Sequence, residues 1–351
     1  MHILKPTADS VKYIGRTLYQ DSILWLALSG SGITFTFHGK QLSVTLQGDD
    51  HTSADTDHAR IGVFINGERI LDTMIKEPQT TYTLLQSEKL QTCTVSVLKL
   101  SEAPMSIVGI ESITTDDAAS LTPAPARQHR IEFIGDSITC GYGTDDKDLS
   151  HSFTTASEDV TKAFAYRTAS LLDTDYSMVS YSGYGVYSGF TDTDIRNTVE
   201  LLPLYYPMVG FSRGTWKGNA ITTADWDFTS YVPELIVINL GTNDDSYCQD
   251  IPDRQEQFTR CYKDFLETVR SYNPHAMILC VYGVMNNRLH PFLEKALEEY
   301  KKETGDTHIY YLPLPTHTEA DGYVIDYHPS LYTHEKISRL VASKIKELMG
   351  W

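Results

Sequence analysis

Four short segments carry groups that together could break an ester bond. Ser137 follows a mostly apolar run at positions 131–134, and a serine hydroxyl becomes a nucleophile once a base takes its proton. His328, in the segment DYHPS, can be that base, because the ordinary pKa of imidazole lies near neutrality. The N–H groups of Ser137 and Gly183 and the side-chain amide of Asn243 could form an oxyanion hole. These residue types indicate acyl transfer by a serine, and this chemistry requires neither a metal nor an organic cofactor.

Each segment taken alone has a simpler structural interpretation. Gly-Asp-Ser can form a turn with a helix cap, a histidine near a C-terminal helix is usually a surface residue or a cap, and Gly-Thr-Asn-Asp can form a turn. Here the segments occur in this order, each after an expected strand or before the last expected helix. Because ligands of parallel sheets bind at the carboxyl ends of the strands, the combination favours a catalytic site.

The elements that must position these segments lie in residues 128–351. Near-continuous apolar runs, typical of parallel strands covered on both faces, occupy positions 130–137, 176–183, 234–241, 276–283 and 309–314. Apolar residues at helical spacing follow at positions 256–273, 291–304 and 333–349. The alternation predicts a three-layer, doubly wound α/β domain with a parallel sheet.

Residues 1–122 show the pattern of a different domain. Apolar and polar positions alternate in several short runs, and Asn66-Gly67 between two of them is a strong hairpin signal. Strands at this spacing predict an all-β sandwich of the jelly-roll type. The polar stretch at 114–130 is interpreted as containing the linker, so the predicted domains are 1–122 and 128–351.

Composition narrows the classes of partner. The 351 residues carry a net charge of −17, which argues against binding to nucleic acid or an anionic membrane and favours a neutral substrate. The five scattered cysteines indicate reduced thiols, and the acid-rich stretch at 48–60 fits a solvated loop better than a cation site. No signal peptide is visible, so we expect a cytoplasmic protein, or a secreted one if a leader was removed. A homo-oligomer remains open.

The motifs resemble those of a known family. GDSITCGYG, SGYG, GTND and DYHPS are similar to the sequence blocks of SGNH (GDSL-type) hydrolases, with Ser137, Gly183, Asn243 and His328 at the functional positions. Together with the N-terminal β region, they resemble carbohydrate esterase family 2, which joins a jelly-roll domain to an SGNH domain. The resemblance implies a serine esterase that deacetylates xylo- or other plant oligosaccharides through an acetyl-enzyme. Two alternatives are an SGNH lipase or thioesterase, and an inert carbohydrate-binding protein.

One position departs from the family pattern. Most SGNH hydrolases have an aspartate three residues before the histidine, where this chain has Ile325, and the nearest acid is Asp326. The sequence therefore leaves two candidates to orient His328, namely Asp326 as a third catalytic residue and the backbone carbonyl of Tyr327.

The long segment after Gly183 is rich in aromatic residues. Tyr184 and Trp216 are candidates to stack on a sugar ring of the substrate, with packing inside the protein as the alternative. Trp226 is expected to pack in the core.

Overall fold

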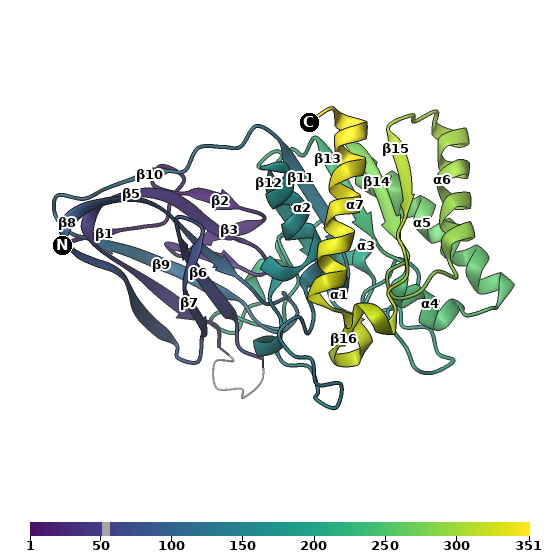
Figure 1. Ribbon diagram of the computed structural model, residues 1–351, viewed down its shortest axis with the longest axis horizontal. Helices are drawn as coiled ribbons and strands as arrows, with labels where there is room; N and C mark the ends of the chain where they lie inside the picture. Colours follow the sequence, from purple (N-terminus) through teal and green to yellow (C-terminus); the bar gives the residue numbers. More distant parts are fainter. Residues whose placement is uncertain (51–56) are drawn as a thin grey trace. The chain divides into compact units, whose positions relative to one another are not determined.

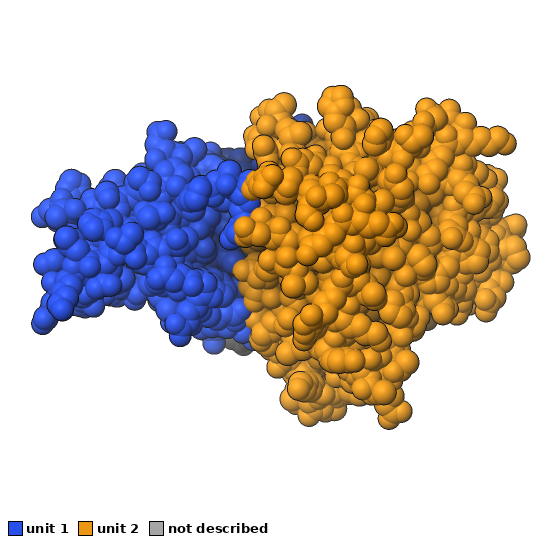
Figure 2. Space-filling view, turned by 45° about the horizontal axis from the view of Figure 1, so that its top comes forward, with its two compact units in different colours: residues 1–127, 154–158, 208–226 blue, residues 128–153, 159–207, 227–351 orange. Residues whose placement is uncertain are grey.

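The computed structural model describes residues 1–50 and 57–351, which form two compact units (Figure 2). Unit 1 comprises Met1–Arg127, Thr154–Glu158 and Met208–Trp226, and unit 2 comprises Gln128–Phe153, Asp159–Pro207 and Asp227–Trp351. The sequence predicted a single change of domain near residues 122–128, whereas two later segments also belong to unit 1. Residues 51–56 of the acid-rich stretch lie outside the described residues.

Unit 1 is built from antiparallel strands, which are β1 (His2–Leu4), β2 (Lys12–Ile14), β3 (Thr17–Gln20), β4 (Ile23–Leu26), β5 (Gly32–Gly48), β6 (Arg60–Ile65), β7 (Glu68–Met74), β8 (Gln79–Lys99), β9 (Val108–Thr115) and β10 (Ser120–Pro123). They pair in the order β3-β4-β9-β5-β8-β6-β7, with β1 on β9 and with β2 and β10 on β5. The predicted all-β domain is confirmed.

The long strand β5 explains how one sheet curls around a core. Its large buried apolar side chains occupy odd positions in the first half, such as Phe35 and Phe37, and even positions in the second, such as Leu42 and Val44. Register shifts against β8 beyond Gly39 allow this change of parity. A bulge bends the strand and increases its twist, so both halves keep their apolar side chains inside.

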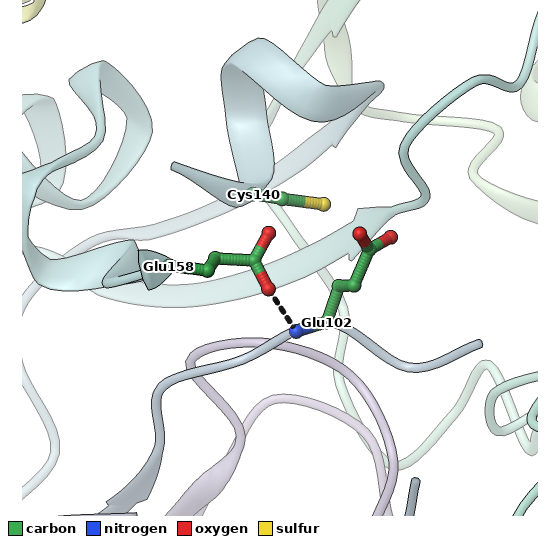
Figure 3. A group of neighbouring side chains, drawn as sticks. All are labelled: Glu102, Cys140 and Glu158. Atoms are coloured by element: carbon green, nitrogen blue, oxygen red, sulfur yellow. Dashed lines mark hydrogen bonds between the residues drawn. The ribbon is translucent and has the colours of Figure 1, made fainter. Parts of the chain in front are cut away.

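The segment Thr154–Glu158 is held in unit 1 by polar contacts. The Arg60 guanidinium donates hydrogen bonds to the carbonyl oxygens of Ala156 and Glu158. The Glu102 N–H donates to the Glu158 carboxyl group (Figure 3). Burial and the nearby Glu102 charge raise the pKa of Glu158 well above its ordinary value. The carbonyl groups of Ala156 and Glu158 thus have partners in unit 1, and the buried residues of the segment can pack there.

The segment Met208–Trp226 is attached to the same unit. The buried Arg16 donates to the Met208 carbonyl at 2.8 Å, and its guanidinium lies 5.5 Å from the centre of the Trp226 ring. The Trp216 ring lies 5.0 Å from that of Trp25, which is fully buried.

Unit 2 contains a parallel sheet in the order β12-β11-β13-β14-β15 (Figure 1). Its strands are β11 (Arg130–Gly135), β12 (Asp175–Ser180), β13 (Leu235–Asn239), β14 (Met277–Tyr282) and β15 (Ile309–Pro313). All five coincide with the apolar runs of the sequence, because strands buried on both faces need apolar residues at successive positions.

The helices of unit 2 are α1 (Ser137–Cys140), α2 (Phe164–Leu172), α3 (Leu202–Tyr205), α4 (Thr242–Cys248), α5 (Pro252–Tyr272), α6 (His290–Thr304) and α7 (Leu331–Met349). From β11 the chain passes through α2 to β12, on one side of β11. From β13, on the other side of β11, it passes through α5 to β14 and through α6 to β15. Right-handed crossovers in opposite directions place α2 and its partner α7 on one face and the α5–α6 pair on the other. This confirms the predicted three-layer fold.

A two-stranded hairpin precedes α7. It consists of β16 (Tyr323–Val324) and β17 (His328–Pro329), and the sequence did not predict it. No helix in the described ranges 1–50 and 57–351 is long and apolar enough to cross a membrane.

Candidate active site

Ser137 lies where the strand order of the sheet reverses. It follows β11, which has β12 on one side and β13 on the other, and chain crossovers leave this point in opposite directions. Such a switch point leaves a crevice at the carboxyl ends of the strands. Ser137 is the first residue of α1 and is 4% exposed.

The residues before Ser137 explain why a buried strand ends in Gly-Asp-Ser. The Asp136 side chain caps α1 by accepting from the Ile138 N–H at 3.1 Å. A Cβ atom at Gly135 would lie 2.0 Å from the Thr139 Oγ1, so only glycine lets the helix turn back this closely. The structural interpretation of this segment as a cap is therefore correct, and the cap is also what positions the hydroxyl.

His328 pairs with Ser137 through one ring nitrogen and with the backbone through the other. Its Nε2 lies 2.8 Å from the Ser137 Oγ, and its Nδ1 lies 3.2 Å from the Asp326 carbonyl oxygen. A carbonyl can only accept, so Nδ1 carries the proton and Nε2 is left free to accept from the serine hydroxyl. This is the tautomer that a general base for Ser137 requires.

The hairpin β16–β17 creates this arrangement. Val324 pairs with His328 across it, and Asp326 and Tyr327 in the connection both have left-handed backbones, with φ of 50° and 56°. This turn directs the Asp326 carbonyl at the imidazole, so of the two candidates from the sequence Asp326 makes the contact to Nδ1, and it does so through its backbone. The Asp326 carboxylate accepts from the Tyr142 hydroxyl at 2.6 Å. Asp326 thus faces His328 through its backbone.

Burial dominates the electrostatics of the base. Burial lowers the pKa of His328 to about 4, and the nearby His317 lowers this pKa further. The carbonyl and the charge of Asp326 and the carbonyl of Ile325 raise the same pKa, but burial outweighs them. His328 therefore stays neutral, and able to accept a proton, at pH values at which an ordinary histidine is already protonated.

The expected oxyanion residues come from the segments that follow β12 and β13. Gly183 has φ of +85°, which favours glycine, and it lies in a turn in which the Tyr184 N–H donates to the Tyr181 carbonyl. The Asn243 side-chain amide donates to the Tyr184 carbonyl at 2.9 Å. One amide hydrogen of Asn243 thereby fixes the side chain to this turn.

Asp244 is a site residue that the sequence analysis did not single out. Its buried carboxylate accepts hydrogen bonds from the N–H groups of Val186, Tyr187 and Ser188, at 3.0, 2.7 and 3.0 Å. These bonds lower its pKa, but burial outweighs them and raises it to about 6. Burial and the charge of Asp244 likewise raise the pKa of Asp136 to about 7. The position of Asp244 as the last residue of the motif GTND is the sequence feature that could have identified it.

The two aromatic candidates for sugar stacking lie in different units. Tyr184 is 3% exposed and packs against Tyr181 and Tyr205 in unit 2, so its ring is in the packing arrangement that the sequence left as the alternative. Trp216 belongs to unit 1, where it packs on Trp25. An aromatic residue that the sequence analysis did not propose for stacking is Tyr327, which precedes His328 and is 62% exposed.

Comparison with known families agrees with this geometry. Residues 133–336 match the model of the GDSL-like lipase/acylhydrolase family, and residues 13–125 match that of the carbohydrate esterase 2 N-terminal region. The first match covers more than half of the chain, and it includes Ser137 and His328.

Individual proteins that are similar to the chain are also esterases. The chain is 26% identical over 332 residues to the cellulase/esterase CelE of Acetivibrio thermocellus, covering 93% of this chain but only 38% of CelE. It is 24% identical over 356 residues to an acetylxylan esterase/glucomannan deacetylase of Cellvibrio japonicus, covering 100% and 92% of the two chains. A family two carbohydrate esterase from Clostridium thermocellum, solved in complex with cellohexaose, gives a TM-score of 0.84 at 27% identity over 97% of this chain and 99% of that one.

The depressed pKa of His328 predicts the pH dependence of activity. Because only the neutral imidazole accepts the serine proton, the acid limb of kcat/KM on p-nitrophenyl acetate should lie below the ordinary histidine value of about 6.5. Asp326→Asn removes a charge that raises this pKa, so its limb should lie lower still. A wild-type midpoint at or above 6.5, or an upward shift in the variant, would contradict this assignment.

The contact through the backbone predicts unequal losses for two neighbours. His328→Ala removes the base and should lower kcat by about four orders of magnitude or more. Asp326→Ala keeps the carbonyl that faces Nδ1, so a loss of about 10- to 100-fold is expected. Both are measured on one acetyl ester, and equal losses would make the Asp326 carboxylate a full catalytic partner.

The three hydrogen bonds to Asp244 predict a role in holding the loop after Gly183. Asp244→Ala should lower kcat/KM by about 10- to 100-fold, because misplaced oxyanion donors stabilise the transition state less. Asp245→Asn is the matched control, since Asp245 is the next residue and pairs with Arg288. Equal effects of the two substitutions would argue against a specific role of Asp244.

Proposed function

The chain belongs to the GDSL-like lipase/acylhydrolase family, and its N-terminal region matches the carbohydrate esterase 2 model. From this premise we propose that it removes O-acetyl groups from acetylated plant oligosaccharides. The observation that carries the proposal is the 2.8 Å contact between the Ser137 Oγ and the His328 Nε2, with Nδ1 held by a carbonyl. This pair is a nucleophile with its base in the required tautomer.

The first half of the reaction transfers the acetyl group to the enzyme. The Ser137 Oγ attacks the carbonyl carbon of the acetyl ester while the His328 Nε2 takes the hydroxyl proton. The tetrahedral intermediate then collapses, the bond to the sugar oxygen breaks, and the Nε2–H returns the proton to that oxygen. The products of this half are the free sugar hydroxyl and an acetyl ester on Ser137.

The second half releases acetate. A water molecule gives a proton to the His328 Nε2 and attacks the acetyl-enzyme, and the proton returns to the Ser137 Oγ as the acyl bond breaks. In both halves the N–H groups of Ser137 and Gly183 and the Asn243 amide are proposed to hold the oxyanion. The contact of Asn243 with the Tyr184 carbonyl supports this role, because it fixes the amide before substrate arrives.

Several features support a neutral glycan as the substrate. The relatives include an acetylxylan esterase/glucomannan deacetylase and a carbohydrate esterase solved with cellohexaose. The net charge of −17 disfavours anionic substrates. The exposed Tyr327 ring next to His328 offers an apolar face on which a sugar ring can stack, whereas the buried Tyr184 ring supports packing better.

The proposal predicts that Ser137→Ala loses acetate release. It also predicts that the wild type prefers short acyl groups. The variant should release no acetate above background from acetylated xylo-oligosaccharides, because no other group can carry the acyl intermediate. Ser150→Ala, at an exposed serine, is the matched control and should match the wild type. Wild-type kcat/KM should be higher on p-nitrophenyl acetate than on the octanoate.

Each alternative function gives a different result in this experiment. Equal or better turnover of octanoyl esters would support a lipase. Binding of the oligosaccharide without acetate release by the wild type would support an inert carbohydrate-binding protein. Acetate release by Ser137→Ala at the wild-type rate would contradict the assignment of the nucleophile.

A further inference from the structure

The catalytic imidazole is one layer of a stack of three rings in unit 2. The Tyr142 ring lies 4.2 Å from the His328 ring at an angle of 27°, and it lies 4.1 Å from the Phe153 ring at 13°. Both neighbours are nearly parallel to Tyr142 at about the thickness of a ring, so they cover its two opposite faces. Tyr142 is therefore fixed by Phe153 on one side and packs on His328 on the other.

The Tyr142 hydroxyl contacts the residue that orients the same imidazole. It donates to the Asp326 carboxylate at 2.6 Å, and the Asp326 carbonyl faces the His328 Nδ1 at 3.2 Å. Asp326 has a left-handed backbone with φ of 50°, which non-glycine residues keep only where their surroundings hold them. The bond from Tyr142 is one such constraint.

The backbone around Tyr142 belongs to the turn that carries the nucleophile. The Tyr142 N–H donates to the Ser137 carbonyl at 3.1 Å, and the flanking Gly141 and Gly143 have φ of +86° and +67°. A Cβ atom at Gly143 would lie 2.4 Å from the Ile325 Cγ1, so this turn packs tightly against the segment that bears His328. Tyr142 thereby links the nucleophile to the base.

We propose that Tyr142 is a positioning residue, which holds the His328 imidazole for proton exchange with Ser137 in place of a triad carboxylate. The inference rests on the proposed esterase function. A carbonyl is a neutral acceptor and orients an imidazole less strongly than a carboxylate, because charge-assisted hydrogen bonds are about twice as strong as neutral ones. The Tyr142 ring adds orientation by blocking rotation of the imidazole.

The stack also acts on the transition state. His328 becomes a cation when it takes the serine proton, and the face of an aromatic ring attracts a cation more than a neutral ring. The contact with Tyr142 is therefore strongest when the proton has moved. An interaction of this kind raises kcat and leaves substrate binding nearly unchanged.

Two substitutions separate the ring from the hydroxyl. Tyr142→Leu removes both and should lower kcat on p-nitrophenyl acetate by about 30-fold or more, with KM within about twofold of the wild type. Tyr142→Phe keeps the stack and should lose only about three- to tenfold in kcat. Tyr272→Leu is the matched control, because Tyr272 stacks on Phe228 with the same 4.1 Å and 13° in the same unit; its kcat should match the wild type.

A double-substitution cycle tests the route through Asp326. In the Asp326→Ala background the Tyr142 hydroxyl has lost this carboxylate, so Tyr142→Phe should change kcat by less than about twofold. Tyr142→Leu in that background should still lower kcat by about tenfold, since the ring on His328 remains to be lost. Independent, multiplicative effects of Tyr142→Phe and Asp326→Ala would overturn the route through the carboxylate.

A second readout keeps this inference separate from the choice of substrate. A fluorophosphonate reacts with an activated serine without an acetylated sugar. The Ser137 Oγ attacks phosphorus, the His328 Nε2 takes the hydroxyl proton, and fluoride leaves. The order of labelling rates should be wild type, then Tyr142→Phe, then Tyr142→Leu. Labelling in this order without acetate release would overturn the proposed substrate and support Tyr142. Acetate release and labelling at wild-type rates in Tyr142→Leu would overturn the role of Tyr142 and leave the esterase intact.

Discussion

The site depends on the level at which three parallel strands end. Gly135, at the end of β11, pairs with Ser180 of β12 on one side and with Asn239 of β13 on the other. The segments that follow these strands therefore emerge side by side at one edge of the sheet, and the order β12-β11-β13 places Ser137 between the others. Backbone pairing thus brings together the proposed nucleophile and the proposed oxyanion groups before any side chain of the site makes a contact.

The base comes from a different kind of element. His328 lies in a short hairpin before α7, where the sheet gives it no fixed position, and its orientation depends on a turn with two left-handed residues. In that turn Ile325 is buried, and Asp326 directs its carbonyl toward the Nδ1 atom. The geometry of this connection, more than the identity of the acid within it, determines the tautomer of the imidazole.

The sequence was sufficient for features that follow from burial and from chain order. The strands β11 to β15 were predictable because parallel strands need apolar residues on both faces, and the switch point then made Ser137 and Asn243 neighbours of one crevice. Features that depend on backbone angles were not predictable. Whether the carbonyl of Asp326 or that of Tyr327 faces the imidazole depends on φ values that no residue type there requires. The return of residues 154–158 to unit 1 depends on contacts of Arg60 with backbone carbonyls, which leave no periodic pattern.

In this site the carboxyl groups hold the backbone and Tyr142, and neutral groups orient the imidazole of His328. Asp136 caps the helix of the nucleophile and Asp244 holds three N–H groups of the loop after Gly183, so the buried carboxyl groups fix backbone. The third acid, Asp326, accepts from Tyr142. Among the described residues, the hydrogen-bond partners of the His328 ring nitrogens are the Ser137 hydroxyl and the Asp326 carbonyl, and both groups are neutral. Burial lowers the pKa of His328, and neutral partners stabilise its charged form less than an adjacent carboxylate would, so they offset this effect only in part. Rigid packing must then supply the orientation that charge does not, and the stacked ring of Tyr142 is the group placed to supply it.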